Sequence, residues 1–184
     1  MAGGANAGTV AVTFAQVGSD VVLTAAGSLS SISGNLVGYN LGEVFPSSGK
    51  VAFGIPSPGR SSLGQVSCSV SPTSAFGTGG QINATSFSGD QFDLEAQSGF
   101  LYVRPNFTGG SINSTMTLAN TQLSSLGLTS GGVTYTCGAD TITVNVAPSP
   151  TAQAVPSLSE WAQLMLALIV MTVIGWHFHR ERSY

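Results

Sequence analysis

Charged side chains are scarce in this chain, since Asp, Glu, Lys and Arg make up 7% of its 184 residues. Lys50 is the single lysine, and only Arg60 and Arg104 join it as basic residues before position 150. So few cations cannot form a patch that neutralises the phosphates of a nucleic acid. We therefore expect no nucleic-acid partner.

Histidine is equally scarce. Both histidines, His177 and His179, lie close to the C-terminal end. A Ser–His or Cys–His catalytic pair and a histidine zinc site all need an imidazole, and the preceding residues have none to offer. The sequence also lacks a G-x-S-x-G elbow and a phosphate-binding Walker loop. We expect a protein that is not an enzyme and that needs no metal or other cofactor.

A long uncharged run stands near the C-terminus, at residues 161–178. As a helix it would be about 27 Å long, close to the thickness of a bilayer's hydrocarbon core. Trp161 and Trp176 lie near its ends, and Arg180 and Arg182 follow as a basic flank. The pattern predicts a transmembrane helix over about 160–178 in contact with membrane lipid, with the C-terminus in the cytoplasm. A buried core helix is the alternative.

Seven residues precede this run and carry a family resemblance. They are Val155, Pro156, Ser157, Leu158, Ser159, Glu160 and Trp161. Followed by an apolar span and a short basic tail, they resemble the IPTL-CTERM sorting signal, which is similar in layout to PEP-CTERM. The resemblance implies a bacterial exported protein, processed by an exosortase-like protease. It places the chain in the inner membrane as a single-pass protein, with its domain outside the cytoplasm and open to transfer to the cell surface.

The residues before this signal have the pattern of a β domain over 1–147, joined by a Pro-rich linker at 148–156 to the sorting signal at 157–184. Val10, Val12 and Phe14 alternate with polar or small residues, as in a half-buried strand. Short strands at regular spacing, separated by Gly-rich turns, favour an antiparallel β-sandwich or jelly roll. Residues 35–64 contain three prolines, so only short edge strands are expected there.

Residues 89–146 carry a second resemblance. The segments GDQF, LYVRP, SSLGLT and YTCGADTITV are similar to blocks in the ectodomains of PEP-CTERM-type proteins. The resemblance agrees with an exported domain. The first residues have neither a basic start nor an apolar stretch, so a secretory leader is expected to be missing from this sequence.

Cys68 and Cys137 are the two cysteines of the chain. Each shares an apolar strand face with neighbouring residues, and a disulfide is the economical interpretation outside the cytoplasm. Two free buried thiols are the alternative, because cysteine packs well in protein cores.

The clearest acidic cluster is formed by Asp90, Asp93 and Glu95. These side chains offer oxygen ligands for calcium or a carboxylate pair for glycoside hydrolysis. The alternative is structural. Asp93 and Glu95 then lie on the solvent face of a strand whose Phe92 and Leu94 point inward, and Asp90 lies in a turn.

Taken together, the sequence favours an exported, membrane-anchored bacterial surface protein with a structural or adhesive role in the extracellular matrix. One alternative is a carbohydrate-binding or carbohydrate-cleaving β module. It would use an extracellular polysaccharide as partner and an aromatic strip of Tyr39, Phe45, Tyr102 and Phe107. Another alternative is a single-span accessory subunit of a membrane complex.

Overall fold

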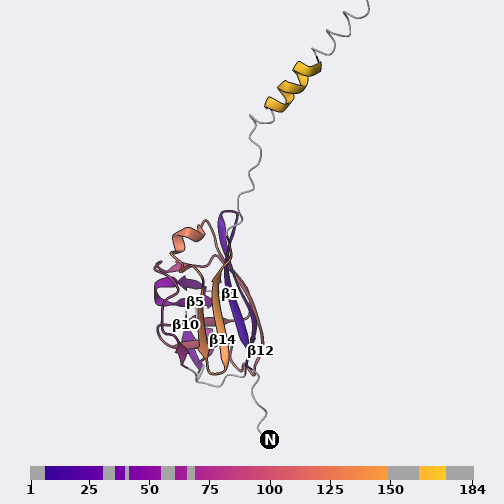
Figure 1. Ribbon diagram of the computed structural model, residues 1–184. Coiled ribbons are helices and arrows are strands. Elements are labelled where there is room, and N and C mark those ends of the chain that lie inside the picture. Colours follow the sequence, from indigo (N-terminus) through magenta and orange to yellow (C-terminus); the bar gives the residue numbers. More distant parts are fainter. Residues whose placement is uncertain are drawn as a thin grey trace, which may run out of the picture. The chain divides into compact units, whose positions relative to one another are not determined.

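The computed structural model describes residues 7–30, 36–39, 42–54, 61–65, 69–148 and 162–172 (Figure 1). The chain divides into two compact units, Met1–Ser149 and Pro150–Tyr184. The first unit contains two seven-stranded sheets, and the fold of the described residues is mainly β, as the sequence predicts.

The first sheet, sheet A, has β1 in a central position. Across the sheet its strands follow the order β7 (Val70–Ser71), β13 (Val133–Cys137), β14 (Asp140–Val146), β1 (Thr9–Val17), β2 (Asp20–Leu29), β12 (Gly110–Leu118) and β9 (Ser86–Gly89). β1 and β14 run parallel, and the other neighbours in this sheet run antiparallel. β1 and β2 form a hairpin, with Gly18 in the left-handed conformation at its turn.

The second sheet, sheet B, is antiparallel throughout. Its order is β3 (Leu36–Tyr39), β6 (Ser61–Gln65), β11 (Phe100–Val103), β10 (Phe92–Glu95), β5 (Lys50–Phe53), β4 (Glu43–Phe45) and β8 (Ile82–Asn83). β5 lies between β10 and β4, so the segment expected to supply edge strands also supplies an interior one. Two short 3-10 turns, η1 (Pro46–Ser48) and η2 (Leu123–Leu126), connect strands.

One hydrophobic core holds the two sheets together. On β1 the alternating residues Val10, Val12 and Phe14 are fully buried, and they join inward residues of both sheets in a single cluster. Phe14 also packs on Phe76, with ring centroids 5.9 Å apart, and Phe53 packs on Phe92 at 6.2 Å. Removal of these apolar surfaces from water is the main favourable contribution to folding.

The parallel pairing of β1 with β14 corrects the expectation of a purely antiparallel sandwich. Six residue pairs, from Thr9–Thr141 to Phe14–Val146, are in register. Alternation of apolar and polar residues marks where a strand lies but does not state its partner or direction. The pairing joins residues more than 120 positions apart, and no local pattern could reveal it.

The second unit corrects the prediction of a membrane anchor. Its described helix covers residues 162–172. A helix of that length is about 16 Å long, about half of what a bilayer core requires. In the described part of the chain, no helix is both long and apolar enough to cross a membrane. The transmembrane helix predicted over about 160–178 is therefore wrong, and so is the single-pass inner-membrane location that depended on it.

Asp140 fastens the start of β14 to two other segments of sheet A. Its carboxylate is 2% exposed and accepts hydrogen bonds from the Gly8 amide at 2.7 Å, the Ser30 amide at 3.0 Å and the Ser30 hydroxyl at 2.6 Å. Hydrogen bonds to an ionised acceptor are stronger than those between neutral groups. This carboxylate therefore joins the residues before β1, after β2 and at the start of β14.

We expect Asp140→Ala to lower the free energy of unfolding by about 3 kcal/mol, because the donors lose a charged acceptor. Urea unfolding monitored by circular dichroism measures the change. Thr134→Ala, at an exposed position on β13, is the matched control and should stay within about 0.5 kcal/mol of the wild type. Equal stability of the two variants would mean that Asp140 does not fasten the sheet.

Tyr135 fastens β13 to the segment between β7 and β8. Its ring is fully buried, and its hydroxyl donates a hydrogen bond to the Ser74 carbonyl at 2.9 Å. Burial raises the pKa of Tyr135 from 10.0 to about 12, because the phenolate would lose its water.

This pKa makes stability fall at alkaline pH. Between pH 10 and about 12 the unfolded chain releases the phenolic proton while the folded chain keeps it, so the free energy of unfolding decreases as pH rises. Tyr135→Phe should remove roughly 2 kcal/mol of that decrease. Urea unfolding at several pH values across this window tests it. If the free energy of unfolding falls with pH as steeply in the variant as in the wild type, Tyr135 is not the group responsible.

Candidate functional site

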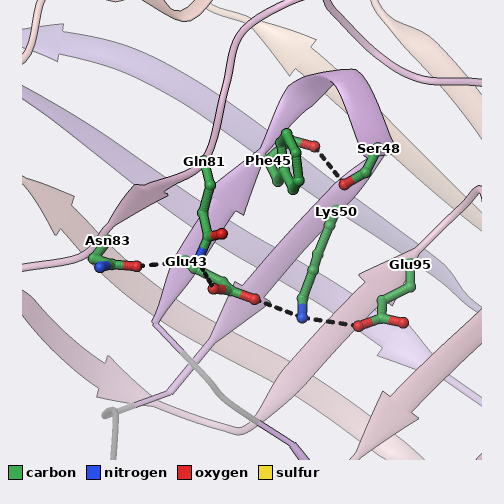
Figure 2. Close-up of polar contacts among 7 residues, drawn as sticks. All are labelled: Glu43, Phe45, Ser48, Lys50, Gln81, Asn83 and Glu95. Carbon is green, nitrogen blue, oxygen red and sulfur yellow. Dashed lines mark hydrogen bonds and ion pairs between the residues drawn. The ribbon is translucent and has the colours of Figure 1, made fainter.

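Three charged side chains meet on sheet B. The strand register places Lys50 of β5 opposite Glu95 of β10 and opposite Phe45 of β4, two residues from Glu43. The Nζ atom of Lys50 lies 2.6 Å from Oε1 of Glu43 and 2.8 Å from Oε1 of Glu95, between the two carboxylates in Figure 2. The three side chains are only 12–16% exposed, so this ion-pair cluster is mostly shielded from water.

The surroundings fix the cluster in place. The other carboxylate oxygen of Glu43 accepts a hydrogen bond from the Gln81 amide (Figure 2). Burial lowers the pKa of Lys50, but Asp93 and the two glutamates raise it more, and the net shift is above the usual value. Lys50 therefore carries its positive charge between the two glutamates, which accept hydrogen bonds from its ammonium.

Asp93 lies next to this cluster on β10, opposite Ala52 of β5 and Tyr102 of β11. It is fully buried, and neither of its carboxylate oxygens has a hydrogen-bond partner. Burial raises the pKa of Asp93 well above its usual value, and the charge of Lys50 offsets only part of this rise. The carboxyl group consequently favours its neutral, protonated form.

The structure separates the three predicted calcium ligands. Asp90 uses one carboxylate oxygen for Arg104, at 2.5 Å, and the other for the Asn113 amide, at 2.9 Å. Glu95 is paired with Lys50, and Asp93 is buried beside that pair rather than on the expected solvent face. The described residues contain no group of three or more acidic, histidine or cysteine side chains placed to hold a metal ion.

The aromatic residues that were predicted to bind sugar do not form an exposed strip. Tyr102 is 2% exposed and Phe107 is 4% exposed, with the Arg104 guanidinium 5.0 Å above the Phe107 ring. Phe45 is half-buried, and the side chain of Tyr39 lies outside the described residues. Sugar rings stack on exposed aromatic faces, so these residues offer little to a carbohydrate.

Sheet A presents a different kind of surface on its outward side. There the strands that bury Val, Ile and Phe on the inside carry mostly hydroxyl, amide and small side chains, and we call one set of these outward residues the threonine face. It consists of Thr9, Ala11, Thr13, Thr24, Ala26, Ser28, Ser88, Ser111, Asn113, Thr115, Thr134, Thr136, Thr141, Thr143 and Asn145. All are exposed or half-buried, and none is charged.

Strand register aligns these side chains in rows. Asn145, Thr13, Thr24, Thr115 and Ser88 lie side by side on five neighbouring strands. A parallel row of Thr134, Thr143, Ala11, Ala26 and Asn113 runs beside it. Neighbours in a row are about 4.8 Å apart, and successive outward residues of a strand are about 6.8 Å apart. The face is thus a regular array of hydroxyl, amide and methyl groups.

The hydroxyl groups in the middle of the array are available to a ligand. Within the described part of the chain, the side chains of Thr13, Thr24 and Thr115 make no hydrogen bond with protein groups. Buried hydroxyls of this protein behave differently, since that of Ser114 donates to the Asp90 carbonyl at 2.6 Å. The array can donate to and accept from a ligand without losing internal hydrogen bonds.

Among the described residues there is also a shallow cavity of about 290 Å³. It lies between Leu123 and Ser130 and includes Val146. Its lining holds aliphatic groups and hydroxyls but no acid, base or activated nucleophile, so it offers no catalytic chemistry.

Two further predictions fall largely outside the described residues. The proposed sorting signal at 155–161 and the basic flank of Arg180 and Arg182 lie there, and so does Cys68. Cys137 is disulfide-bonded rather than a free thiol. No bridge between two described residues is seen, and the Cys68–Cys137 pairing stays a prediction.

Sequence reasoning missed Lys50, Glu43 and the threonine face. The Lys50 cluster depends on the register of three strands, which the sequence does not contain. The threonine face did leave a signal, because threonine recurs at alternate positions in β13 and β14, at 134, 136, 141 and 143. Comparisons with known proteins add no name to these sites, since no family model, curated protein or solved structure matches the chain.

Because Asp90 and Glu95 are already engaged with Arg104 and Lys50, we expect calcium to leave the stability of the protein unchanged. A ligand that binds only the folded state raises the melting temperature. Since we expect no calcium to bind, the melting temperatures in excess calcium and in excess chelator should agree within about 1 °C. Differential scanning calorimetry measures this. A rise that disappears in Asp90→Asn would restore the calcium site.

Proposed function

We propose that this chain is an exported structural or adhesive protein of the extracellular matrix, and that its threonine face holds a neutral polysaccharide. The observation that carries the proposal is the regular, uncharged array of hydroxyl groups on sheet A. The strands that carry this array pack against the hydrophobic core with their other side, so the array is rigid before any ligand binds.

Charge complementarity favours a neutral partner. The rows of the threonine face contain no acidic or basic side chain, so an anionic or cationic polymer would lose water without gaining an ion pair. Neutral sugars carry many hydroxyl groups beside apolar C–H surfaces. Threonine matches both, because its hydroxyl forms hydrogen bonds and its methyl group contacts the C–H surface.

A carbohydrate-cleaving activity has less support. Glycoside hydrolysis needs a carboxyl pair with a sugar between them. Between Glu43 and Glu95 stands the ammonium group of Lys50, within 2.8 Å of both carboxylates. Asp93 is fully buried, and a substrate cannot reach it in this conformation.

Residues 155–161 resemble a sorting signal, and this resemblance supports export. It also supports the proposal that an exosortase-like protease processes the chain. The low lysine content and the Gly-, Ser- and Thr-rich strands agree with an extracellular β domain. Each neutral contact is weak, but a polymer with repeating sugar units can make many such contacts with the array at once, and together they hold it.

The experiment removes hydroxyl groups and retains shape. Thr13→Val, Thr24→Val and Thr115→Val together keep the β-branched outline of one row, and they should weaken binding to insoluble cellulose about 100-fold, since three hydrogen bonds of about 1 kcal/mol each are lost. A pull-down assay with increasing protein concentration measures the affinity. Binding by the wild type should persist in high salt, because no ion pair contributes.

The matched control is the triple variant Thr73→Val, Thr108→Val and Thr129→Val, whose positions are exposed and lie outside the threonine face. It should bind cellulose like the wild type. No binding of the wild type to cellulose, or equal losses in the two triple variants, would overturn the proposal. Binding that high salt abolishes would also overturn it.

A further inference from the structure

Asp93 is the least explained polar group of the described chain. It is fully buried, and both of its carboxylate oxygens lack a hydrogen-bond partner. A buried polar group without a partner costs several kcal/mol in an apolar environment, and native proteins rarely contain one without a reason. The neighbourhood of Asp93 supplies such a reason.

Lys50 is the amine placed to react with it. On the paired strands β5 and β10, Lys50 lies opposite Glu95, and Asp93 lies two residues further along on the same side. Side chains in this diagonal relation have their Cβ atoms roughly 7 Å apart, within reach of a lysine. Each is also the strongest charge partner of the other.

We propose that Lys50 and Asp93 condense to an intramolecular amide, which joins β5 to β10 covalently. The three carboxyl groups near Lys50 are not equivalent. Glu43 and Glu95 are hydrogen-bonded to the lysine as carboxylates, which are poor electrophiles. Asp93 alone is enclosed and unpartnered, and the acid form that burial favours there is the form that an amine attacks.

Glu95 has the position of a base. Its Oε1 atom lies 2.8 Å from Nζ and accepts a proton from the Lys50 ammonium. The freed amine donates its electron pair to Cγ of the protonated Asp93, and a new N–C bond forms. The C–O bond to the hydroxyl group then breaks, and this group leaves as water after it receives a proton from Glu95.

The overall reaction balances without an oxidant or another reagent. An ammonium and a carboxylic acid give an amide, one water molecule and one proton that is released to solvent. Glu95 starts and ends as a carboxylate, and Glu43 holds Nζ from the other side at 2.6 Å (Figure 2). The product removes the buried, unpartnered carboxyl group of Asp93, so that unfavourable burial disappears.

Intact mass spectrometry of the full-length protein, reduced and denatured, tests this inference. The wild type should be lighter than its sequence by the mass of one water molecule, and a digest should contain a peptide that links residues 50 and 93. Lys50→Met and Asp93→Ala should each restore the full mass. Asp90→Ala, a nearby carboxylate outside the cluster, is the matched control and should still lose water.

Lys50 is the only lysine, which gives a second measurement. An amine-reactive reagent should leave position 50 unlabelled in the denatured wild type and label it in Asp93→Ala. In Glu95→Gln, the fraction of cross-linked protein should fall at least tenfold if Glu95 is the base. Full sequence mass with a labelled Lys50 in the wild type would overturn the inference, and so would water loss that persists in Asp93→Ala.

Discussion

The parallel pairing of β1 with β14 is the constraint on which the rest of the domain depends. β1 pairs with β2 on its other side. The position of β1 therefore determines where the β1–β2 hairpin, the β13–β14 hairpin and β12 lie in sheet A. The buried carboxylate of Asp140 joins the segments at one end of the pair. With these strands in register, Val10, Val12 and Phe14 face the core and the threonines of β1 and β14 face outward together.

The scarcity of charge has a structural counterpart in where the charges lie. Asp140 lies inside the sheet, where backbone amides and a serine hydroxyl satisfy it, and Lys50 lies between two glutamates on sheet B. A chain with few ions thus places several of them where water has little access and where each has a specific neighbour. The residues of the threonine face on sheet A carry no charge. The two sheets therefore differ in chemistry, with ion pairs on one and hydroxyl rows on the other.

Much of the strand content could be predicted from the sequence, because burial on one side of a sheet imposes a period of two. Residues 9–17 and 92–95 illustrate this success. The same rule predicts that Asp93 is exposed to water, and this prediction is wrong. Alternation predicts which side of a strand a residue lies on, but not whether other parts of the protein cover that side. The contacts of Lys50 and Asp140 could not be predicted either, since each depends on strands that are distant in the sequence. For the apolar run at 161–178, hydropathy predicted a helix, and the described residues 162–172 are helical but are too short by themselves to cross a membrane.

The direction of β14 relative to β1 also has a mechanical consequence. Because the two strands are parallel, the chain enters β1 at one end of the pair and leaves β14 at the opposite end. Tension applied through the two ends of the domain therefore pulls these strands past each other along their length. In this shear geometry all the inter-strand hydrogen bonds between Thr9–Thr141 and Phe14–Val146 resist at once, whereas an antiparallel pair with both ends at one side would open one bond at a time. A domain built in this way resists extension.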